Sequence, residues 1–259
     1  MHKVAFVVEY DGTNFHGFQY QPSLRTVQGV LEQVISQVEN TRVRIEYASR
    51  TDAGVHAYYQ VISFFSHRRI EPKKWLQIMR GLLPGDIRVW KVAYVPDEFH
   101  PQRTPHEKEY IYRLSRCPLS VFERGYAWWV RGLDVDKLRR EIEYIQGAHD
   151  FIYFSKTGAP RQNTIRTLHV SLTESGKYVI LSFRSSGFLY GMVRLIVGTL
   201  VEVATGQLPQ GASGKVLNGN IDLRGKSAPA GGLFLKEIRY NKTDIKWQEE
   251  CESDEDDNT

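Results

Sequence analysis

Cysteine is scarce in this sequence, and long apolar runs are missing from it. The two cysteines, Cys117 and Cys251, lie in distant parts of the chain and form no Cys-x-x-Cys pair. This usage indicates a reducing compartment, so we expect a cytoplasmic protein. The longest apolar stretch is interrupted at Gly198 and Glu202, well short of the ~20 residues that a membrane span needs. We therefore expect neither a signal segment nor a contact with a membrane.

Common cofactor and metal motifs are also absent. The eight histidines show no metal-ligand spacing, and no His-Glu-x-x-His occurs. Residues 206–213 have the glycine spacing of a phosphate-binding P-loop, but Ala212 stands where the lysine of that motif would be. Neither Gly-x-Ser-x-Gly nor Gly-x-Gly-x-x-Gly is present. We therefore expect neither a metal nor a cofactor in this protein.

Acidic side chains are few outside the C-terminal segment. Residues 249–257 hold seven acids and no base, which leaves a net charge of +11 on residues 1–248. A basic body favours a polyanionic partner, most often a nucleic acid. We expect the acidic segment to be disordered and to serve solubility. The alternative is that it folds back onto the basic body as a mimic of the polyanion.

Apolar periodicity divides the 259-residue chain into two halves, each with the order strand-helix-strand-strand-helix-strand. Each half is thus a split-βαβ unit. We predict an α+β fold in which two such RRM-like halves join their antiparallel sheets, with helices on one side and a cleft on the other. The halves span residues 1–105 and 106–241, and an acidic, disordered tail spans 242–259. The expected strands are 3–10, 43–48, 58–66, 86–95, 109–115, 165–173, 177–185 and 233–240. The expected helices are 26–40, 135–145, 189–204 and a segment that starts after Pro72. That segment is expected to bury Trp75, Ile78, Met79, Leu82 and Leu83.

One segment between two expected strands has the composition of a catalytic loop. Residues 48–57 read ASRTDAGVHA, in which Asp52 is followed by the small Ala53 and Gly54 and preceded by Arg50. A nearby guanidinium keeps a carboxylate ionised and orients it, as a nucleophile or a base requires. Taken alone, the Asp-Ala-Gly tripeptide favours a simple turn with a capping carboxylate.

The ten residues together closely resemble the catalytic loop of the TruA family of pseudouridine synthases, whose usual form is GRTDAGVHA. Ser49 replaces the first glycine of that pattern. The resemblance continues in the family's order up to about residue 241. It is carried by YDGTNFHGFQYQP (10–22), TVQGVLEQ (26–33), LLPGDIRV (82–89), DEFHPQRTPHEKEYIYR (97–113), NTIRTLHV (163–170), GFLYGMVRLIVGTL (187–200) and APAGGLFLKEIRY (228–240).

The resemblance implies a tRNA pseudouridine synthase that acts in the anticodon stem-loop, at positions 38–40. Such an enzyme breaks the C1′–N1 glycosidic bond of uridine, turns the uracil and rejoins it through C5, without a cofactor. By motif position, Asp52 is the catalytic residue, which we take as the nucleophile, and the sequence leaves three steps open for it: attack on the sugar, attack on the base, or removal of a ribose proton. Tyr110 contacts the flipped base and Arg194 pairs with Asp52. Arg50 is expected to wedge into the RNA helix where the target nucleotide leaves. The cleft would then bind tRNA, and a homodimer is implied.

Two other functions fit parts of the sequence. A catalytically silent RNA-binding protein on the same fold would be free to lose Asp52, Tyr110 or Arg194. An N-glycoside hydrolase would use Asp52 together with a second carboxylate, for which Glu9 and Asp11 are candidates. Tyr112, on the same strand face as Tyr110, is expected to serve mainly packing.

Overall fold

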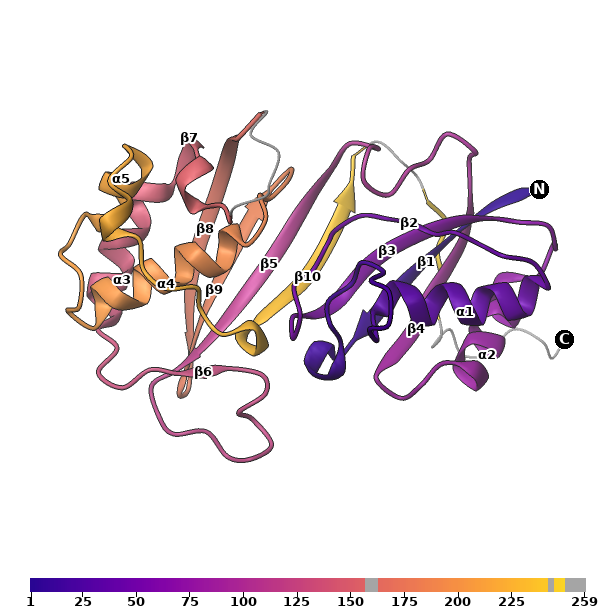
Figure 1. Ribbon diagram of the computed structural model, residues 1–259, viewed down its shortest axis with the longest axis horizontal. Coiled ribbons are helices and arrows are strands. Elements are labelled where there is room, and N and C mark those ends of the chain that lie inside the picture. The colour runs from indigo at the N-terminus through magenta and orange to yellow at the C-terminus, as the bar shows by residue number, and fades with distance from the viewer. Residues whose placement is uncertain (157–162, 242–244, 250–259) are drawn as a thin grey trace, which may run out of the picture. The chain divides into compact units, whose positions relative to one another are not determined.

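The structure is a computed structural model that describes residues 1–156, 163–241 and 245–249. The chain divides into two compact units, one formed by residues 1–106 with the chain from Ile238 on, the other by residues 107–237 (Figure 1). The first boundary lies next to the one expected between the halves. The last strand differs from the expectation, because it leaves the second unit and ends in the first. The Tyr240 ring packs on Phe99, and its hydroxyl donates to the carbonyl of Pro101 at 2.8 Å, which holds this end in the first unit.

Antiparallel strands form the sheet of the first unit. The central strand β1 lies between β3 and β4, and β2 pairs with the outer side of β3. Register places Phe6 opposite both Ile62 and Val92, so apolar side chains of three strands share one face. The strands are β1 (His2–Tyr10), β2 (Glu46–Tyr47), β3 (His56–Ser66) and β4 (Ile87–Val95).

Two helices, α1 (Val27–Glu39) and α2 (Pro72–Leu82), cover the same side of this sheet (Figure 1). Helix α1 begins after Thr26, whose hydroxyl accepts a hydrogen bond from the amide of Gly29, and it ends at Asn40 in the left-handed conformation. In α2, Trp75 packs edge-on against Phe6 and Phe64, with ring centroids 5.4 and 5.7 Å apart.

The buried stripe of α2 differs in part from the one expected. Trp75 and Met79 are buried as predicted, but Leu82 is 42% exposed and Leu76 is buried in its place. Ile78 and Leu83 are only half-buried. The helix ends at Leu82, and residues 80–82 of its last turn are exposed.

The strand expected at residues 43–48 shrinks to the two residues of β2. The reason lies in α1, because side chains of that helix bind the amides that a strand would use. Ser36 Oγ accepts from the amide of Val43 at 2.9 Å, and Glu32 Oε1 accepts from the amide of Ile45 at 3.2 Å. Backbone groups satisfied in this way do not need a neighbouring strand.

The second unit also consists of a layer of strands and a layer of helices. Its strands follow the order β5-β9-β8-β7 with antiparallel neighbours, and β6 runs parallel to β5. The helices lie together on one side of these strands (Figure 1). The strands are β5 (His106–Ser115), β6 (Trp128–Trp129), β7 (Gly147–Asp150), β8 (Ile165–Ser175) and β9 (Tyr178–Ser185), the helices are α3 (Val135–Ile142), α4 (Met192–Ala204) and α5 (Ala212–Leu217), and β10 (Leu233–Tyr240) crosses the unit boundary. Single 3-10 turns lie at Gly12–Asn14, Glu143–Ile145, Ile152–Phe154, Ile221–Leu223 and Ala230–Gly232.

The glycine-spaced segment 206–213 does form an anion-binding turn, but its anion is part of the chain. Glu141 is fully buried, and its carboxylate accepts hydrogen bonds from the amides of Gly211 at 2.7 Å and Ser213 at 2.6 Å and from the Gln210 side chain at 2.7 Å. Buried carboxylates are tolerated when several donors surround them. The turn therefore ties α3 to the start of α5.

The tail predicted to be disordered from residue 242 is ordered in part. Gln248 and Glu249 form β11, which pairs antiparallel with β4 opposite Val92 and Lys91. An ion pair between Lys91 and Glu249 joins the two strands. The open edge of β4 and the opposite charges explain why this stretch pairs. The disorder expected for residues 250–259 lies outside the described residues.

Candidate active site

Two loops of the first unit pack against each other around Asp52. The Asp52 loop (residues 48–55) connects β2 to β3, and the opening loop (residues 11–18) follows β1. The amide of Phe18 donates to the carbonyl of Thr51 at 3.1 Å, and the amide of Gly54 donates to the carbonyl of Phe15 at 3.3 Å. The two loops are thus joined on both sides of Asp52.

Two glycines of the opening loop make this packing possible. A Cβ atom on Gly12 would lie 2.0 Å from the carbonyl oxygen of Val55, closer than any side chain can be. A Cβ on Gly17 would lie 2.8 Å from the carbonyl oxygen of Thr51, and its φ of +87° favours glycine as well. The opening loop therefore fits the backbone of the Asp52 loop at both of its ends.

Buried side chains fix the start of the Asp52 loop. The Tyr10 hydroxyl lies 2.8 Å from Thr51 Oγ1 in the interior. The fully buried amide side chain of Gln60 binds both backbone groups of Ser49, accepting from its N–H at 3.1 Å and donating to its carbonyl at 2.6 Å. Asp52 itself is half-buried and Arg50 is exposed. The carboxylate thus stands on a fixed loop that substrate can reach.

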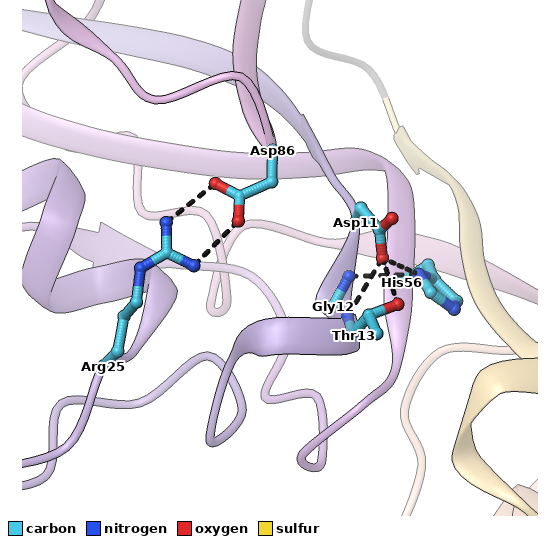
Figure 2. Close-up of polar contacts among 6 residues, drawn as sticks. All are labelled: Asp11, Gly12, Thr13, Arg25, His56 and Asp86. Carbon is cyan, nitrogen blue, oxygen red and sulfur yellow. Dashed lines mark hydrogen bonds and ion pairs between the residues drawn. The ribbon is translucent and has the colours of Figure 1, made fainter. Parts of the chain in front are cut away.

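A bidentate ion pair between Arg25 and Asp86 lies beside the opening loop. The two terminal nitrogens of Arg25 lie 2.7 and 2.8 Å from the two carboxylate oxygens of Asp86 (Figure 2). The hydrogen bond with Asp86 raises the pKa of the Arg25 guanidinium above its ordinary value. The guanidinium also lies 4.0 Å from the centre of the Phe15 ring, and the carbonyl of Asp86 accepts from the amide of Asp11 at 3.0 Å. Arg25 and Asp86 thus brace the loop that packs on Asp52.

A double-mutant cycle of Arg25→Ala and Asp86→Ala should give a coupling free energy of about 0.5–1 kcal/mol, because bidentate geometry is favourable while partial exposure screens the charges. The matched control is the pair Arg88–Glu9, in which a terminal nitrogen of Arg88 lies 3.0 Å from a carboxylate oxygen of Glu9 and both side chains are more exposed. Its coupling should be about 0–0.5 kcal/mol. Urea unfolding measures both cycles, and equal coupling in the two pairs would contradict a bracing role for Arg25.

The carboxylates considered as partners for a hydrolase have other contacts. Glu9 pairs with Arg88 at 3.0 Å. Asp11 Oδ1 accepts from the amide of Thr13 at 2.9 Å and from its hydroxyl at 2.5 Å, which caps the 3-10 turn Gly12–Asn14 (Figure 2). These contacts are those of fold-stabilising groups.

In the second unit, Tyr110 lies on β5 with its side chain packed among apolar groups. It is 5% exposed, and its ring meets that of Phe188 edge-on at 5.0 Å. Two residues away on the same face, Lys108 is also buried, and burial together with the charge of Arg166 lowers its pKa to about 8. Tyr112 is fully buried and donates its hydroxyl to the carbonyl of Pro229 at 2.7 Å, which confirms the packing role predicted for it.

Arg194 lies in the first turn of α4, in the second unit. Its neighbours Met192, Val193 and Leu195 are buried, while Arg194 is half-buried. Its Nε donates to the carbonyl of Ala228 at 2.7 Å. Asp52 and Arg50 belong to the first unit and Tyr110 and Arg194 to the second. The pairing of Arg194 with Asp52 stays a prediction.

Several residues around Asp52 were not predicted from the sequence to be parts of the site. Each of them lies in the Asp52 loop, directly follows it, or contacts one of its residues. The sequence did contain a signal, because the opening segment 10–22 carries the family pattern in which several of these residues occur. They are Tyr10, Gly12, Gly17, Thr51, His56 and Gln60. Asp11, which the sequence offered only as a partner carboxylate for a hydrolase, contacts His56.

Comparison with known proteins shows the family to which the chain belongs. The pattern of the family described as tRNA pseudouridine synthase matches residues 6–102 and 142–241. The chain belongs to the tRNA pseudouridine synthase family. The relatives named "tRNA pseudouridine synthase A" include one from Oceanobacillus iheyensis, 38% identical over 93% of this chain and 98% of its own length, and one from Bacillus licheniformis, 39% identical over 92% and 99%. A third, from a Thermoanaerobacter species, is 37% identical over 93% of this chain and its whole length.

The prediction of a pseudouridine synthase family is therefore confirmed. The matched segments of the tRNA pseudouridine synthase pattern include the Asp52 loop, the opening loop and Arg194, while Tyr110 falls in the interval between them. In the described part of the chain, no group of three or more His, Cys, Asp or Glu side chains is placed to hold a metal ion. The same part contains no helix that is both long and apolar enough to cross a membrane.

Proposed function

We propose that this chain is an isomerase that converts uridine to pseudouridine in tRNA, at positions 38–40 of the anticodon stem-loop. The observation that carries the proposal is the position of the Asp52 carboxylate. It is half-buried on a loop that is hydrogen-bonded to the opening loop, in a chain of the tRNA pseudouridine synthase family. A catalytic carboxylate needs such a fixed but accessible position. The net charge of +11 on residues 1–248 supports binding to an RNA backbone.

In this reaction the C1′–N1 bond breaks, a C1′–C5 bond forms, the hydrogen on C5 leaves as a proton and N1 gains one, so atoms balance without a cofactor. Asp52 acts as the nucleophile. Tyr110 stacks on the flipped uracil and Arg194 pairs with Asp52, while Arg50, which is exposed, fills the place that the nucleotide leaves in the RNA. An arginine on an apolar helix favours a carboxylate partner, because an unpaired charge there is costly.

The same proposal covers the assembly of the protein. The two units are split-βαβ halves whose sheets join, and the face opposite the helices forms the cleft that receives tRNA. The protein acts in the cytoplasm as a homodimer. The α+β composition of each unit and the helices on one side of each sheet support this arrangement.

Stem-loop RNAs with a uridine at only one of positions 38, 39 and 40 test the proposed substrate. We expect pseudouridine at these positions and none in a stem-loop that carries cytidine at all three. Mapping of pseudouridine by carbodiimide modification and primer extension reads out each position. Tight binding of every RNA without conversion of any of them would favour the silent RNA-binding protein instead.

A further inference from the structure

The histidine that follows the Asp52 loop is buried and contacts the opening loop. His56 is the first residue of β3 and is 2% exposed. Its Nδ1 lies 3.0 Å from the amide nitrogen of Gly12 and 3.1 Å from Asp11 Oδ1 (Figure 2). This side chain is not one of those to which the proposed reaction gives a role.

One ring nitrogen cannot accept a hydrogen bond from Gly12 and donate one to Asp11 at the same time. The Gly12 N–H is directed at Nδ1, so we assign the neutral ring with its hydrogen on Nε2. Asp11 Oδ1 in turn accepts from the backbone and the hydroxyl of Thr13. The imidazole is thus the acceptor for the first amide of the opening loop's 3-10 turn.

This bond acts on the C-terminal end of the Asp52 loop. Gly12 lies against the carbonyl of Val55, the residue just before His56, with no space for a Cβ between them. The amide of Val55 donates to the carbonyl of Asp52 at 3.1 Å. A shift of Val55 would therefore also move the backbone that carries the Asp52 carboxylate. The N-terminal end of the loop is held separately, by Tyr10 and Phe18 through Thr51.

We propose that His56 is a positioning residue for Asp52, which holds the opening loop against Val55 by accepting the Gly12 amide. The inference rests on the proposed function for its effect on turnover, but the contact that it assigns exists in the free protein. Catalytic groups must be held within about 0.5 Å of their productive position. A shift of about 1 Å can reduce turnover roughly 10²-fold.

Two substitutions of His56 separate positioning from packing. His56→Leu fills the space but accepts no hydrogen bond, whereas Oδ1 of His56→Asn can take the place of Nδ1. We expect His56→Leu to lower kcat for a stem-loop RNA about 10–100-fold with KM changed less than about 2-fold, and His56→Asn to recover at least half of the lost kcat on a logarithmic scale. His67→Leu, the same change at an exposed position just after β3, should behave as wild type.

Amide hydrogen exchange on the RNA-free proteins provides a second test, which does not depend on activity. Exchange at Gly12 and Gly54 should accelerate at least about 10-fold in His56→Leu and stay near the wild-type rate in His56→Asn and His67→Leu. A wild-type protein without synthase activity would refute the proposed function and leave this exchange test valid. Unchanged exchange and kcat in a folded His56→Leu protein, or equal losses in the leucine and asparagine variants, would overturn the positioning role.

Discussion

Asp52→Asn should abolish conversion of uridine, with kcat lowered at least about 10³-fold, while tRNA affinity stays within about 3-fold of the wild type. The amide keeps the size of the carboxylate but removes the charge on which its role as a nucleophile depends. Affinity persists because RNA binding comes mainly from phosphate contacts distributed over many basic side chains. Single-turnover assays and filter binding measure the two quantities.

Asp222→Asn is the matched control, because it makes the same change at an exposed residue of the second unit. It should leave turnover, affinity and melting temperature unchanged. Substantial conversion by Asp52→Asn would exclude Asp52 as the nucleophile. A parallel loss of tRNA affinity would show that the carboxylate serves the shape of the loop more than the chemistry.

Gly12→Ala should lower both the stability of the protein and its turnover. The new methyl would lie 2.0 Å from the carbonyl oxygen and 2.5 Å from the carbonyl carbon of Val55, so backbone rather than a flexible side chain must move. We expect a loss of about 1–3 kcal/mol in the free energy of unfolding. Displacement of Val55 should also lower kcat about 10²-fold, because the Asp52 loop moves with it.

Gly85→Ala provides the comparison, since a methyl group there meets nothing within 4 Å. It should change the free energy of unfolding by less than about 0.5 kcal/mol and leave kcat intact. Thermal melts and steady-state kinetics on both variants check the pair. If Gly12→Ala melts and turns over like Gly85→Ala, the two loops do not depend on close contact.

The elements that follow from local patterns agree between sequence and structure. The stripe that begins at Val27 predicted a helix over 26–40, and α1 spans Val27–Glu39 with Thr26 as its cap. The two-residue alternation of residues 3–10 likewise predicted β1. Both signals depend on neighbours within about one or two turns or pleats, so they can be read without knowledge of the tertiary fold.

Features that depend on distant partners could not be predicted in the same way. The stretch 43–48 has strand-like residues, yet its amides are taken by Glu32 and Ser36 of α1. The phosphate-loop spacing at 206–213 proved to be a turn around Glu141, which lies about seventy positions earlier. In each case a buried polar side chain, not the local pattern, decides the backbone conformation.

The candidate site shows the same division. The motif around Asp52 could be recognised from ten consecutive residues, whereas the contacts that fix it join β1, the opening loop and β3. The need for glycine at position 12 follows from the carbonyl of Val55, and the role of His56 follows from the amide of Gly12. Neither relation is visible before the two loops are placed together.

The most direct measurement of the central claim is the product formed from a tRNA labelled in its uracil rings. After incubation with the wild-type protein and complete digestion to nucleosides, chromatography separates uridine, pseudouridine and free uracil. We predict that label moves from uridine to pseudouridine in amounts exceeding the enzyme, that no free uracil is released, and that Asp52→Asn leaves the label in uridine. Release of free uracil, or bound tRNA whose label stays in uridine with the wild-type protein, would contradict the assignment of a pseudouridine synthase.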